Sequence, residues 1–394
     1  MSHPEIFVVS AVRSAIGTFG GSLKDVPLTQ LATDVSRAAL TRANIAPELI
    51  GHVVFGNVIP TDTRDAYLAR VAAMNAGIPK ETPAFNVNRL CGSGLQAIVS
   101  AAQSLLLGDA QAVLAGGAES MSRGPYLLPA ARWGGRMGDM QAIDYMLGIL
   151  HDPFAGMHMG ITAENIAAKF GISRAMQDEL ALVSQQRAAH AIAEGRFVSQ
   201  IVPIEIASRK GPVSFSVDEH VRGQVSAEQL QNMKPAFKKD GSVTAGNASG
   251  LNDGAAALVL ATGDMVRQQG LVPLARLVGY AHAGVEPELM GLGPIPATRA
   301  VLKKTGVSVA ELDVIESNEA FAAQACAVAQ ELGFDPAKVN PNGSGISLGH
   351  PVGATGAIIA TKAIYELQRT QGRYGLATMC IGGGQGIAVL FERV

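Results

Sequence analysis

Cysteine and an excess of charge are both lacking in this sequence. Its 394 residues include three cysteines, whereas a secreted chain would use cysteines in pairs, so we expect a reducing compartment. The 31 basic and 33 acidic residues give a formal net charge of −2. This balance offers no electrostatic attraction to nucleic acid or to an anionic membrane surface, and neither partner is expected.

Targeting and membrane-spanning segments are lacking as well. The segment Met1–Glu5 has no basic stretch followed by an apolar core, and Phe391–Val394 is not a peroxisomal signal. No apolar run is both long enough and sufficiently free of glycine to span a bilayer. We therefore expect a soluble, cytoplasmic protein.

Apolar residues and glycine are abundant instead. Hydrophobic residues make up 48% of the chain, which is enough for buried sheets, and 45 glycines indicate many tight turns and close backbone contacts. A chain of 394 residues is too long for one ordinary domain, so two or three compact units are expected.

The two ends of the chain repeat one plan. In the first half, a strand at Val53–Asn57, a helix at Ala66–Ala76 and a strand at Ala84–Asn88 lead to a glycine turn. In the second half, a strand at Val314–Asn318 and a helix at Ala320–Leu332 lead to another glycine turn. An alanine-rich helix and a nearly all-apolar strand then follow in both halves. The pattern predicts a duplicated α/β fold with a parallel or mixed sheet, whose corresponding loops meet at one cleft.

The middle of the chain, about residues 119–249, breaks this plan. It contains a methionine-rich stretch at Met137–Met159, a helix from roughly Ser173 to Gly195, and a patch of basic residues. We interpret it as an insertion into the first half, which resumes at Val243–Leu260.

Cys91 lies between the strand at Ala84–Asn88 and a helix at Leu95–Leu107. At the start of a helix, the macrodipole and the free N–H groups favour a negative charge, so we expect them to lower the pKa of the Cys91 thiol. Such a thiolate is a ready nucleophile, and the neighbouring N–H groups can hold the oxyanion of an attacked carbonyl. For this residue alone, a buried structural cysteine is an equally good interpretation.

The same turn allows a competing interpretation. Gly92–Ala97 fits the dinucleotide-binding pattern G-x-G-x-x-A after a strand, and Glu119 ends the next strand, where a ribose ligand would lie. Against this, the motif does not follow the first strand, and Cys91 would crowd a pyrophosphate. We therefore favour thiol chemistry.

Further candidates lie beside glycines or at strand ends. His350, in a Gly-His-Pro sequence, can accept a proton from a thiol and then stabilise an anion. Cys380 ends an apolar strand before three glycines, which leave the N–H of Gly382 free to face a cleft. Asn318 follows a strand and either caps a helix or holds a water or carbonyl oxygen. Cys326 lies within a helix and is expected to be core packing.

Four motifs in this order resemble the thiolase family, specifically its acetyl-CoA acetyltransferase and β-ketothiolase branch. They contain Cys91 in NRLCGSGLQA, Asn318 in SNEAFAAQ, His350 in NGSGISLGHPVGATG and Cys380 in MCIGGGQG. The resemblance covers the whole chain, from Val9–Gly17 onwards.

The resemblance implies the thiolase fold, in which two βαβαβαββ halves form five αβαβα layers and carry an inserted loop domain. On this chain, the N-terminal half would span residues 1–118 and be completed by about 250–272. The loop domain that binds coenzyme A would span 119–249, and the C-terminal half 273–394. The family also implies a homotetramer, built as a dimer of dimers.

The resemblance further implies a mechanism. Cys91 would attack a thioester and become acylated, while His350 takes its proton. Cys380, as a thiolate, would remove the α-proton of a second acetyl-CoA, and the enolate would attack the acyl-enzyme to give a 3-oxoacyl-CoA by ping-pong kinetics. The N–H groups of Cys91 and Gly382 would hold the first oxyanion, and His350 with a water on Asn318 would hold the enolate.

Thioesters of coenzyme A would be the substrates, and neither a cofactor nor a metal is expected. The coenzyme A contacts of the family match residues of the insert and of the second half: Leu150, His158, Met159, Arg222, Phe237, Ser249 and Ala320. Met290 is expected to border the acyl pocket, and the match at His158–Gly160 indicates short, unbranched acyl chains.

Three alternatives compete with this assignment. A decarboxylating, ketoacyl-synthase-like condensing enzyme shares the fold and the nucleophile, but it would have no second catalytic cysteine. A Cys-His hydrolase would leave Cys380 unexplained. A binding module that had lost activity would have replaced one of the reactive residues, and Cys91, His350 and Cys380 are all present.

Overall fold

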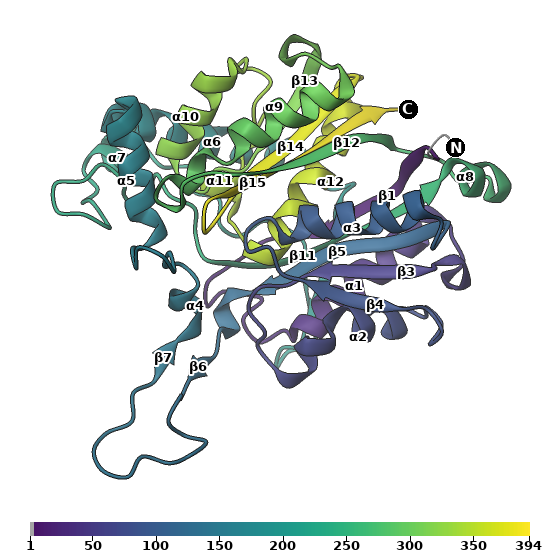
Figure 1. The fold of residues 1–394 in the computed structure, drawn as a ribbon, viewed down its shortest axis with the longest axis horizontal. Helices are drawn as coiled ribbons and strands as arrows, with labels where there is room; N and C mark the ends of the chain where they lie inside the picture. Colours follow the sequence, from purple (N-terminus) through teal and green to yellow (C-terminus); the bar gives the residue numbers. More distant parts are fainter. Residues whose placement is uncertain (1–3) are drawn as a thin grey trace.

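The computed structural model describes residues 4–394, and Figure 1 shows two α/β halves with an insert beside them. The main strands of the N-terminal half are β1 (Ile6–Ser14), β3 (His52–Gly56), β4 (Ala84–Val87), β5 (Ala112–Ser120) and β11 (Asn252–Thr262). They lie in the order β4-β3-β5-β11-β1. β3 runs parallel to β4 and β5, whereas β11 runs antiparallel to β5 and β1.

The C-terminal half repeats this sheet. Its main strands are β12 (Ala275–Gly284), β13 (Leu312–Ser317), β14 (Tyr374–Ile381) and β15 (Gln385–Arg393). They lie in the order β13-β14-β15-β12, with β13 parallel to β14, and β15 antiparallel to its two neighbours. Val339 bridges Ile315 in parallel at the outer edge, in the place that β4 takes in the first half. The predicted duplication is confirmed.

The two sheets meet at one edge. There, Phe7 and Val8 of β1 pair with Arg276 and Ala275 of β12. Within residues 4–394, this contact makes one 11-stranded sheet, which includes the short strands β2 (Gly17–Thr18) and β8 (Ile201–Val202). Helix α8 (Gly263–Gln269) connects β11 to β12.

Helices form three layers around the two sheets (Figure 1). The outer face of the first sheet is covered by α1 (Leu28–Ala43) and α2 (Leu68–Asn75), and that of the second by α9 (Pro294–Thr305) and α10 (Ala322–Leu332). Between the sheets, α3 (Ser93–Leu107) packs against α12 (Val352–Thr370). Short helical segments join these elements: α11 (Gly345–Leu348), η1 (Pro47–Leu49), η2 (Thr63–Tyr67), η3 (Met121–Arg123), η4 (Pro287–Leu292) and η5 (Val309–Glu311). The five-layer arrangement that the resemblance to thiolases implied is confirmed.

Two glycines let the central helices cross near their N-terminal ends. A Cβ on Gly94 would lie 2.5 Å from the backbone nitrogen of Ala357, and a Cβ on Gly356 would lie closer still to α3. No side chain tolerates such contacts, so the helices need glycine here. Because Cys91 lies two residues before α3 and His350 lies two residues before α12, this crossing brings both residues to one place.

The central helix α3 is the most membrane-like segment of the described chain. Its window Leu90–Leu107 has a mean hydropathy of 1.4, yet 61% of that window is buried inside the protein. A helix that has a sheet on each side must be apolar all round. The composition of α3 therefore follows from its place in the core.

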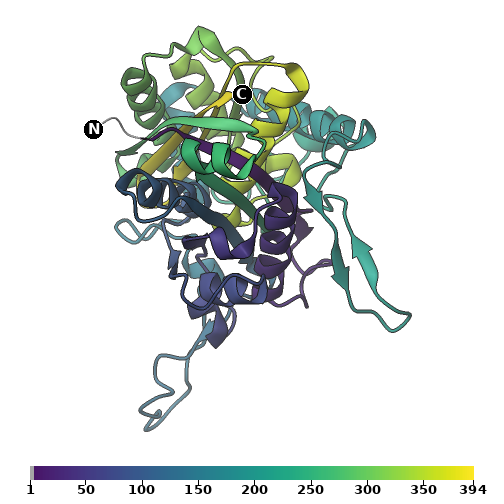
Figure 2. The same cartoon turned by 90° about the vertical axis from the view of Figure 1, so that its right-hand side faces the viewer.

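The insert lies between β5 and β11. It contains a first hairpin of β6 (Tyr126–Leu127) and β7 (Ile143–Asp144), helices α4 (Tyr145–Gly148), α5 (Met159–Phe170) and α6 (Arg174–Ala193), a second hairpin of β9 (Ile204–Ile206) and β10 (Val213–Phe215), and helix α7 (Ala227–Gln231). Figure 2 shows both hairpins extending from the body as arms. Helix α6 begins after Ser173, whose side chain accepts a hydrogen bond from the N–H of Met176. It ends just before Gly195 at φ 67°, close to the predicted bounds.

Candidate active site

A cavity of about 410 Å³ lies where the two halves and the insert meet. Cys91, His350, Cys380 and Gly382 line it, although they come from distant parts of the chain. The eight residues suggested as coenzyme A and acyl contacts line the same cavity: Leu150, His158, Met159, Arg222, Phe237, Ser249, Met290 and Ala320. Asn318 does not line it.

Cys91 lies in a strained turn between β4 and α3. The preceding residue, Leu90, has φ 45°, a left-handed conformation that a bulky residue adopts only when its surroundings enforce it. The Ser93 side chain helps to hold Leu90 in this conformation. It accepts a hydrogen bond from the N–H of Arg89 at 2.9 Å and donates one to the Leu90 carbonyl at 2.7 Å. The turn holds the Cys91 sulfur toward the cavity.

The expected lowering of the Cys91 pKa by the helix is wrong. Burial raises the pKa of the Cys91 thiol, and the N–H groups of Gly382 and of Cys91 itself offset this only in part. The ionised carboxylate of Glu119 raises it further. Desolvation of a thiolate exceeds the field of a helix terminus when water is excluded. Cys91 is therefore a neutral thiol at rest, and it needs a base to become a nucleophile.

His350 presents one ring nitrogen to the cavity in a defined protonation state. Its Nδ1 lies 2.7 Å from the hydroxyl oxygen of Thr355, and that hydroxyl donates to the carbonyl of Pro351 at 2.9 Å. The hydroxyl can therefore only accept from Nδ1–H, which leaves the lone pair on Nε2. Nε2 is buried and has no hydrogen-bond partner among residues 4–394. The backbone N–H of His350 donates to the side chain of Asn252 at 2.9 Å, which fixes the turn.

The imidazole of His350 is a neutral base in the resting enzyme. Burial lowers its pKa to about 4, so the ring is neutral at pH 7 and binds a proton from bulk water only as the pH falls toward 4. A base with so low a pKa holds a transferred proton only while a new anion beside it stabilises the imidazolium.

Thr355→Val is expected to lower catalytic efficiency about 10- to 100-fold, the range typical of a misplaced catalytic group. Valine has the same shape but cannot accept from Nδ1–H, so the ring is free to turn or to change tautomer. Thr355→Ser keeps the acceptor and should restore most of the activity. Steady-state kinetics of both variants check this, and equal activity of valine and serine variants would refute the assigned tautomer.

Cys380 is the last residue but one of β14 and is fully buried. Burial raises the pKa of its thiol strongly, and the Cys91 sulfur raises it further. Both cysteines line the same cavity. The chain then turns back into β15 through Gly383 and Gly384, at φ 78° and 84°, so the turn requires glycine.

Asn318 lies just beyond β13, and its side chain is fully buried. Its backbone N–H donates to the carbonyl of Thr378 at 3.0 Å, but neither Oδ1 nor Nδ2 has a partner among residues 4–394. Helix α10 begins at Ala322 after Phe321, so Asn318 is not the helix cap. A buried amide with both polar atoms free is costly and indicates a place for a small polar partner.

Comparison with known proteins agrees with this geometry. Residues 6–264 match the family model for the N-terminal domain of thiolase, and residues 271–393 match that for its C-terminal domain. The chain belongs to the thiolase family. It is 62% identical to the beta-ketothiolase BktB of Cupriavidus necator, over 99% of both chains. It is 50% identical to an acetyl-CoA acetyltransferase of Chromobacterium violaceum, over 99% of this chain and 100% of that protein.

Solved structures of thiolases have the same fold. The acetyl-CoA acetyltransferase of Bacillus anthracis superposes with a TM-score of 0.98 at 48% identity, over 100% of both chains. Human mitochondrial 3-ketoacyl-CoA thiolase in complex with CoA superposes with a TM-score of 0.96 at 45% identity, over 99% of this chain and 98% of that one.

The insert forms one wall of the cavity of this thiolase. His158 caps α5 by accepting from the N–H of Gly160 at 3.0 Å, and its ring stacks on Phe237 with centroids 4.7 Å apart. The N–H of Ser249 donates to the carbonyl of Ala320 at 2.9 Å, which joins the two walls. One apolar cluster contains Cys380 together with Met159, Met290 and Ala320. This cluster excludes water from the Cys380 sulfur.

Sequence reasoning missed Thr355, Asn252 and His220. Thr355 lies five residues after His350, in the first turns of α12, and this spacing was the available signal. Asn252 starts β11 and looks like an ordinary strand residue. His220 lines the cavity, and burial lowers its pKa to about 4. In the sequence it follows two acidic residues in a polar segment that resembles an exposed loop, so nothing there indicated a site.

Glu119 does not bind a ribose as the dinucleotide interpretation required. Its buried carboxylate accepts from the side chain of Asn57 at 2.8 Å, from the N–H groups of Val58 and Ile59, and from the N–H of Gly353 at 2.8 Å. Burial raises its pKa to about 8. Since Gly94 of the motif packs against α12 and Gly92 packs against Ile381 of β14, no space remains for a pyrophosphate, and that alternative is wrong.

Proposed function

We propose that this thiolase is a β-ketothiolase, an acetyl-CoA C-acyltransferase that condenses acetyl-CoA with a short acyl-CoA and cleaves the 3-oxoacyl-CoA in reverse. One observation carries the proposal: Cys91, Cys380 and a neutral His350 line a single cavity. Two thiols and one base are the groups that a non-decarboxylating thioester condensation needs, since one sulfur holds the acyl group while the other moves the α-proton.

In the first half-reaction, His350 takes the proton of Cys91, and the sulfur attacks the thioester carbonyl. The N–H groups of Cys91 and Gly382, which already face the Cys91 sulfur, hold the oxyanion. Cys380 gives its proton to the departing coenzyme A thiolate. The products are acyl-Cys91, free coenzyme A, a Cys380 thiolate and a His350 imidazolium, so every proton is accounted for.

In the second half-reaction, the Cys380 thiolate removes the α-proton of acetyl-CoA. The enolate oxygen is held by the His350 imidazolium and by a water on Asn318, whose free buried amide suits that partner. The enolate carbon attacks acyl-Cys91 to form the 3-oxoacyl-CoA. The released Cys91 thiolate recovers its proton from His350, which restores the resting enzyme.

The ketoacyl-synthase-like alternative is not favoured. Such an enzyme generates its nucleophile by decarboxylation and needs no base for an α-proton, whereas Cys380 lines the same cavity as Cys91, where a second thiol can serve as that base. The close relatives are named as ketothiolases and acetyltransferases.

Coenzyme A thioesters fit the cavity as substrates, with no separate cofactor. The apolar wall formed by Met159, Phe237 and Met290 suits the pantetheine arm and a short acyl group, and Arg222 at the cavity suits a phosphate. Among residues 4–394, no cluster of three or more His, Cys, Asp or Glu side chains is arranged to hold a metal ion. We infer a cytoplasmic location from the three unpaired cysteines and from these substrates.

Incubation with 3-oxoacyl-CoAs of increasing length and free coenzyme A tests the proposal. Loss of the absorbance of the Mg²⁺-enolate of the substrate measures cleavage, and two acetyl-CoA should form for each acetoacetyl-CoA consumed. Activity should be highest for short, unbranched chains. Cleavage of none of these substrates would refute the proposed activity.

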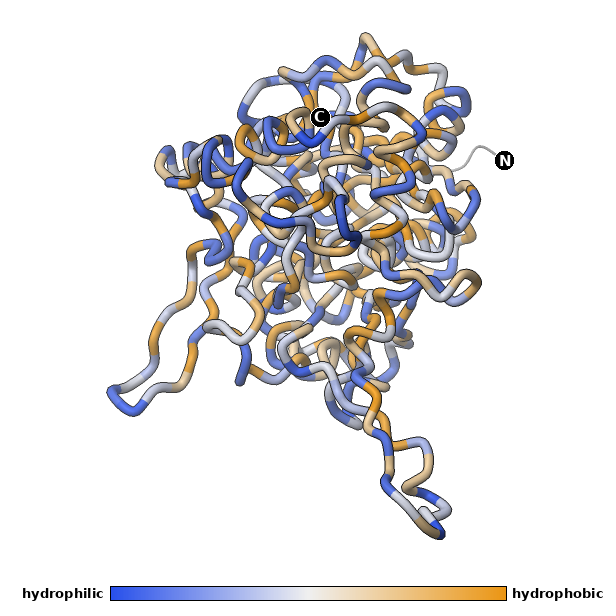
Figure 3. Tube along the Cα trace, turned by 90° about the vertical axis from the view of Figure 1, so that its left-hand side faces the viewer, coloured by the Kyte–Doolittle hydropathy of each residue, from blue (hydrophilic) through white to orange (hydrophobic). Residues whose placement is uncertain are grey.

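We also propose that the protein is a homotetramer held together through the β6–β7 arm. The tip of this arm exposes Trp133 and Met137, at 88% and 96%. Figure 3 shows hydrophobic segments along the arms, far from the core. Large apolar side chains on an extended arm indicate a protein partner, and a second copy of the chain is the simplest one.

The double substitution Trp133→Ser, Met137→Ser is expected to convert tetramers to dimers because it removes the apolar contacts of the arm. Size-exclusion chromatography with light scattering measures the change. Val198→Ser, which alters another exposed apolar side chain, serves as the control and should leave the tetramer intact. An unchanged mass for the double variant would contradict the role of the arm.

A further inference from the structure

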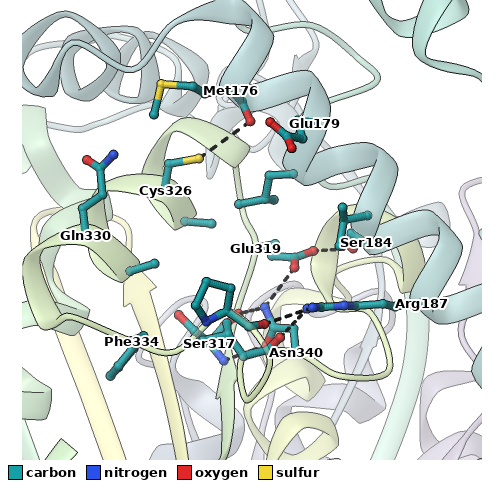
Figure 4. Close-up of a pocket in the computed structure, with 16 residues that line it drawn as sticks. Met176, Glu179, Ser184, Arg187, Ser317, Glu319, Cys326, Gln330, Phe334 and Asn340 are labelled. Atoms are coloured by element: carbon teal, nitrogen blue, oxygen red, sulfur yellow. Dashed lines mark hydrogen bonds between the residues drawn. The ribbon is translucent and has the colours of Figure 1, made fainter.

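Glu319 follows Asn318 directly and has a fully buried carboxylate. Its two oxygens accept hydrogen bonds from the Ser184 hydroxyl at 2.6 Å and from the Asn340 side chain at 2.9 Å (Figure 4). The backbone N–H of Ile346 also favours the ionised carboxylate. Three separate segments therefore meet at this side chain: helix α6 of the insert, the end of β13, and the loop 340–349 that leads to His350.

The loop 340–349 packs directly on Asn318. A Cβ on Gly345 would lie 2.8 Å from Oδ1 of Asn318, so only a glycine permits this approach. The Asn340 side chain pairs with the backbone of Ser317 through both its oxygen and its nitrogen, at 2.9 and 2.8 Å. The distance between the Asn318 amide and the loop that carries His350 thus depends on bonds made within this small region.

Helix α6 is loosely packed on the other side of Glu319. A second cavity of about 340 Å³ lies between α6 and α10, lined mostly by apolar side chains from Met176 to Val339, with Glu319 and Asn340 at its floor (Figure 4). Because apolar contact is incomplete here, the bond from Ser184 to Glu319 fixes where α6 lies relative to Asn318. The Ser184 oxygen also lies 2.8 Å from the hydroxyl oxygen of Ser347 in the same loop, and it accepts there because its own proton goes to Glu319.

Stability alone does not explain a carboxylate at this position. Burial raises the pKa of Glu319, so ionisation costs free energy, and the residue makes no ion pair within residues 4–394. The nearby Lys362 is bonded to Glu316 and to the carbonyl of Gly343 instead. A glutamine or an apolar residue of similar size would be less costly unless the carboxylate organises its neighbours.

We propose that Glu319 is a positioning residue that holds the Asn318 amide and the His350 loop at the spacing needed to bind the enolate oxygen. The inference rests on the proposed function, because it assigns Glu319 to the second half-reaction. Acylation of Cys91 uses the N–H groups of Cys91 and Gly382 and the His350 base, but not the Asn318 amide. The His350 ring is held by Thr355 and its backbone N–H by Asn252, and neither bond involves Glu319. Loss of Glu319 should therefore affect the two half-reactions unequally.

Glu319→Gln is the test, since glutamine has the same size but places an N–H₂ group against one of the two donors, Ser184 or Asn340. Acylation is measured as the burst of coenzyme A released from acetyl-CoA, and enolisation as deuterium exchange at the methyl group of acetyl-CoA bound to acylated enzyme. Acylation should change less than about threefold. Exchange and condensation should both fall about 10- to 100-fold, as expected for a displaced oxyanion donor.

Glu179→Gln is the matched control, because Glu179 is an exposed residue at the rim of the same second cavity. It should keep the wild-type ratio of the two rates. Ser184→Ala removes one donor from the same carboxylate and should lower exchange about threefold, which decides the matter if Glu319→Gln does not fold. Equal losses in both half-reactions, or an unchanged ratio in Ser184→Ala, would overturn the proposal. A wild-type enzyme that is acylated but never condenses would refute the proposed function instead.

Discussion

Cys91→Ala is expected to lower turnover by roughly 10⁴- to 10⁶-fold, the scale of loss when an enzyme loses its covalent nucleophile. No other sulfur can take over, because Cys380 packs within the apolar cluster that contains Met159 and Met290, and burial strongly raises the pKa of its thiol. Both half-reactions should fail together, since without an acyl-enzyme there is no electrophile for the enolate. Mass spectrometry after incubation with acetyl-CoA should find no added acetyl group, and cleavage of acetoacetyl-CoA should fall to background.

Cys91→Ser should be nearly as inactive as Cys91→Ala. A serine hydroxyl is a much weaker acid than a thiol, and His350, whose pKa is about 4, is too weak a base to ionise it in a dry site. Cys326→Ala provides the control. Cys326 lies on α10 beside the second cavity, burial raises its pKa to about 11, and the change should leave turnover close to that of the wild type. Substantial turnover by Cys91→Ala would contradict the prediction, because another residue than Cys91 would then have to carry the acyl group.

The repeated pattern of the sequence was enough to predict the architecture. The strand at Val314–Asn318 appears as β13, and the helix at Leu95–Leu107 appears as α3. Such elements are determined by local periodicity and by glycine turns, so they can be read without knowing the rest of the chain. The duplication then followed, because both halves present the same order of elements.

The electrostatics of the site could not be predicted in the same way. The helix-terminus argument for Cys91 used only neighbours in sequence, whereas its pKa is decided by how completely β14, the insert and α12 exclude water. The position of Asn318 shows the same limit. Its motif marked a candidate site residue, but its burial behind the cavity surface depends on the loop 340–349 packing against it. Hydrogen bonds such as that from His350 to Thr355 involve residue types too common to stand out.

Cys380→Ser is expected to separate the two half-reactions. Condensation should fall by about a thousandfold or more, because serine cannot form the anion that removes the α-proton of a thioester, which is a very weak acid. Acylation of Cys91 should be slower, because a serine hydroxyl is a weaker acid for the departing coenzyme A thiolate, but it should remain measurable, since its nucleophile, its base and its oxyanion donors are all unchanged. Rapid quench with labelled acetyl-CoA measures acylation, and formation of acetoacetyl-CoA measures condensation.

The protonation state of Cys380 gives this prediction a further consequence. In the resting enzyme, burial strongly raises the pKa of Cys380, so that a thiolate is disfavoured there. In the acyl-enzyme, Cys380 has given its proton to coenzyme A, and the positive charge of the His350 imidazolium stabilises the resulting thiolate. Cys380 should therefore react faster with a small alkylating agent in the acyl-enzyme than in the free enzyme, as mass spectrometry of the modified peptide can show. Equal alkylation rates in the two states, or equal losses of both half-reactions in Cys380→Ser, would refute this division of roles between the two cysteines.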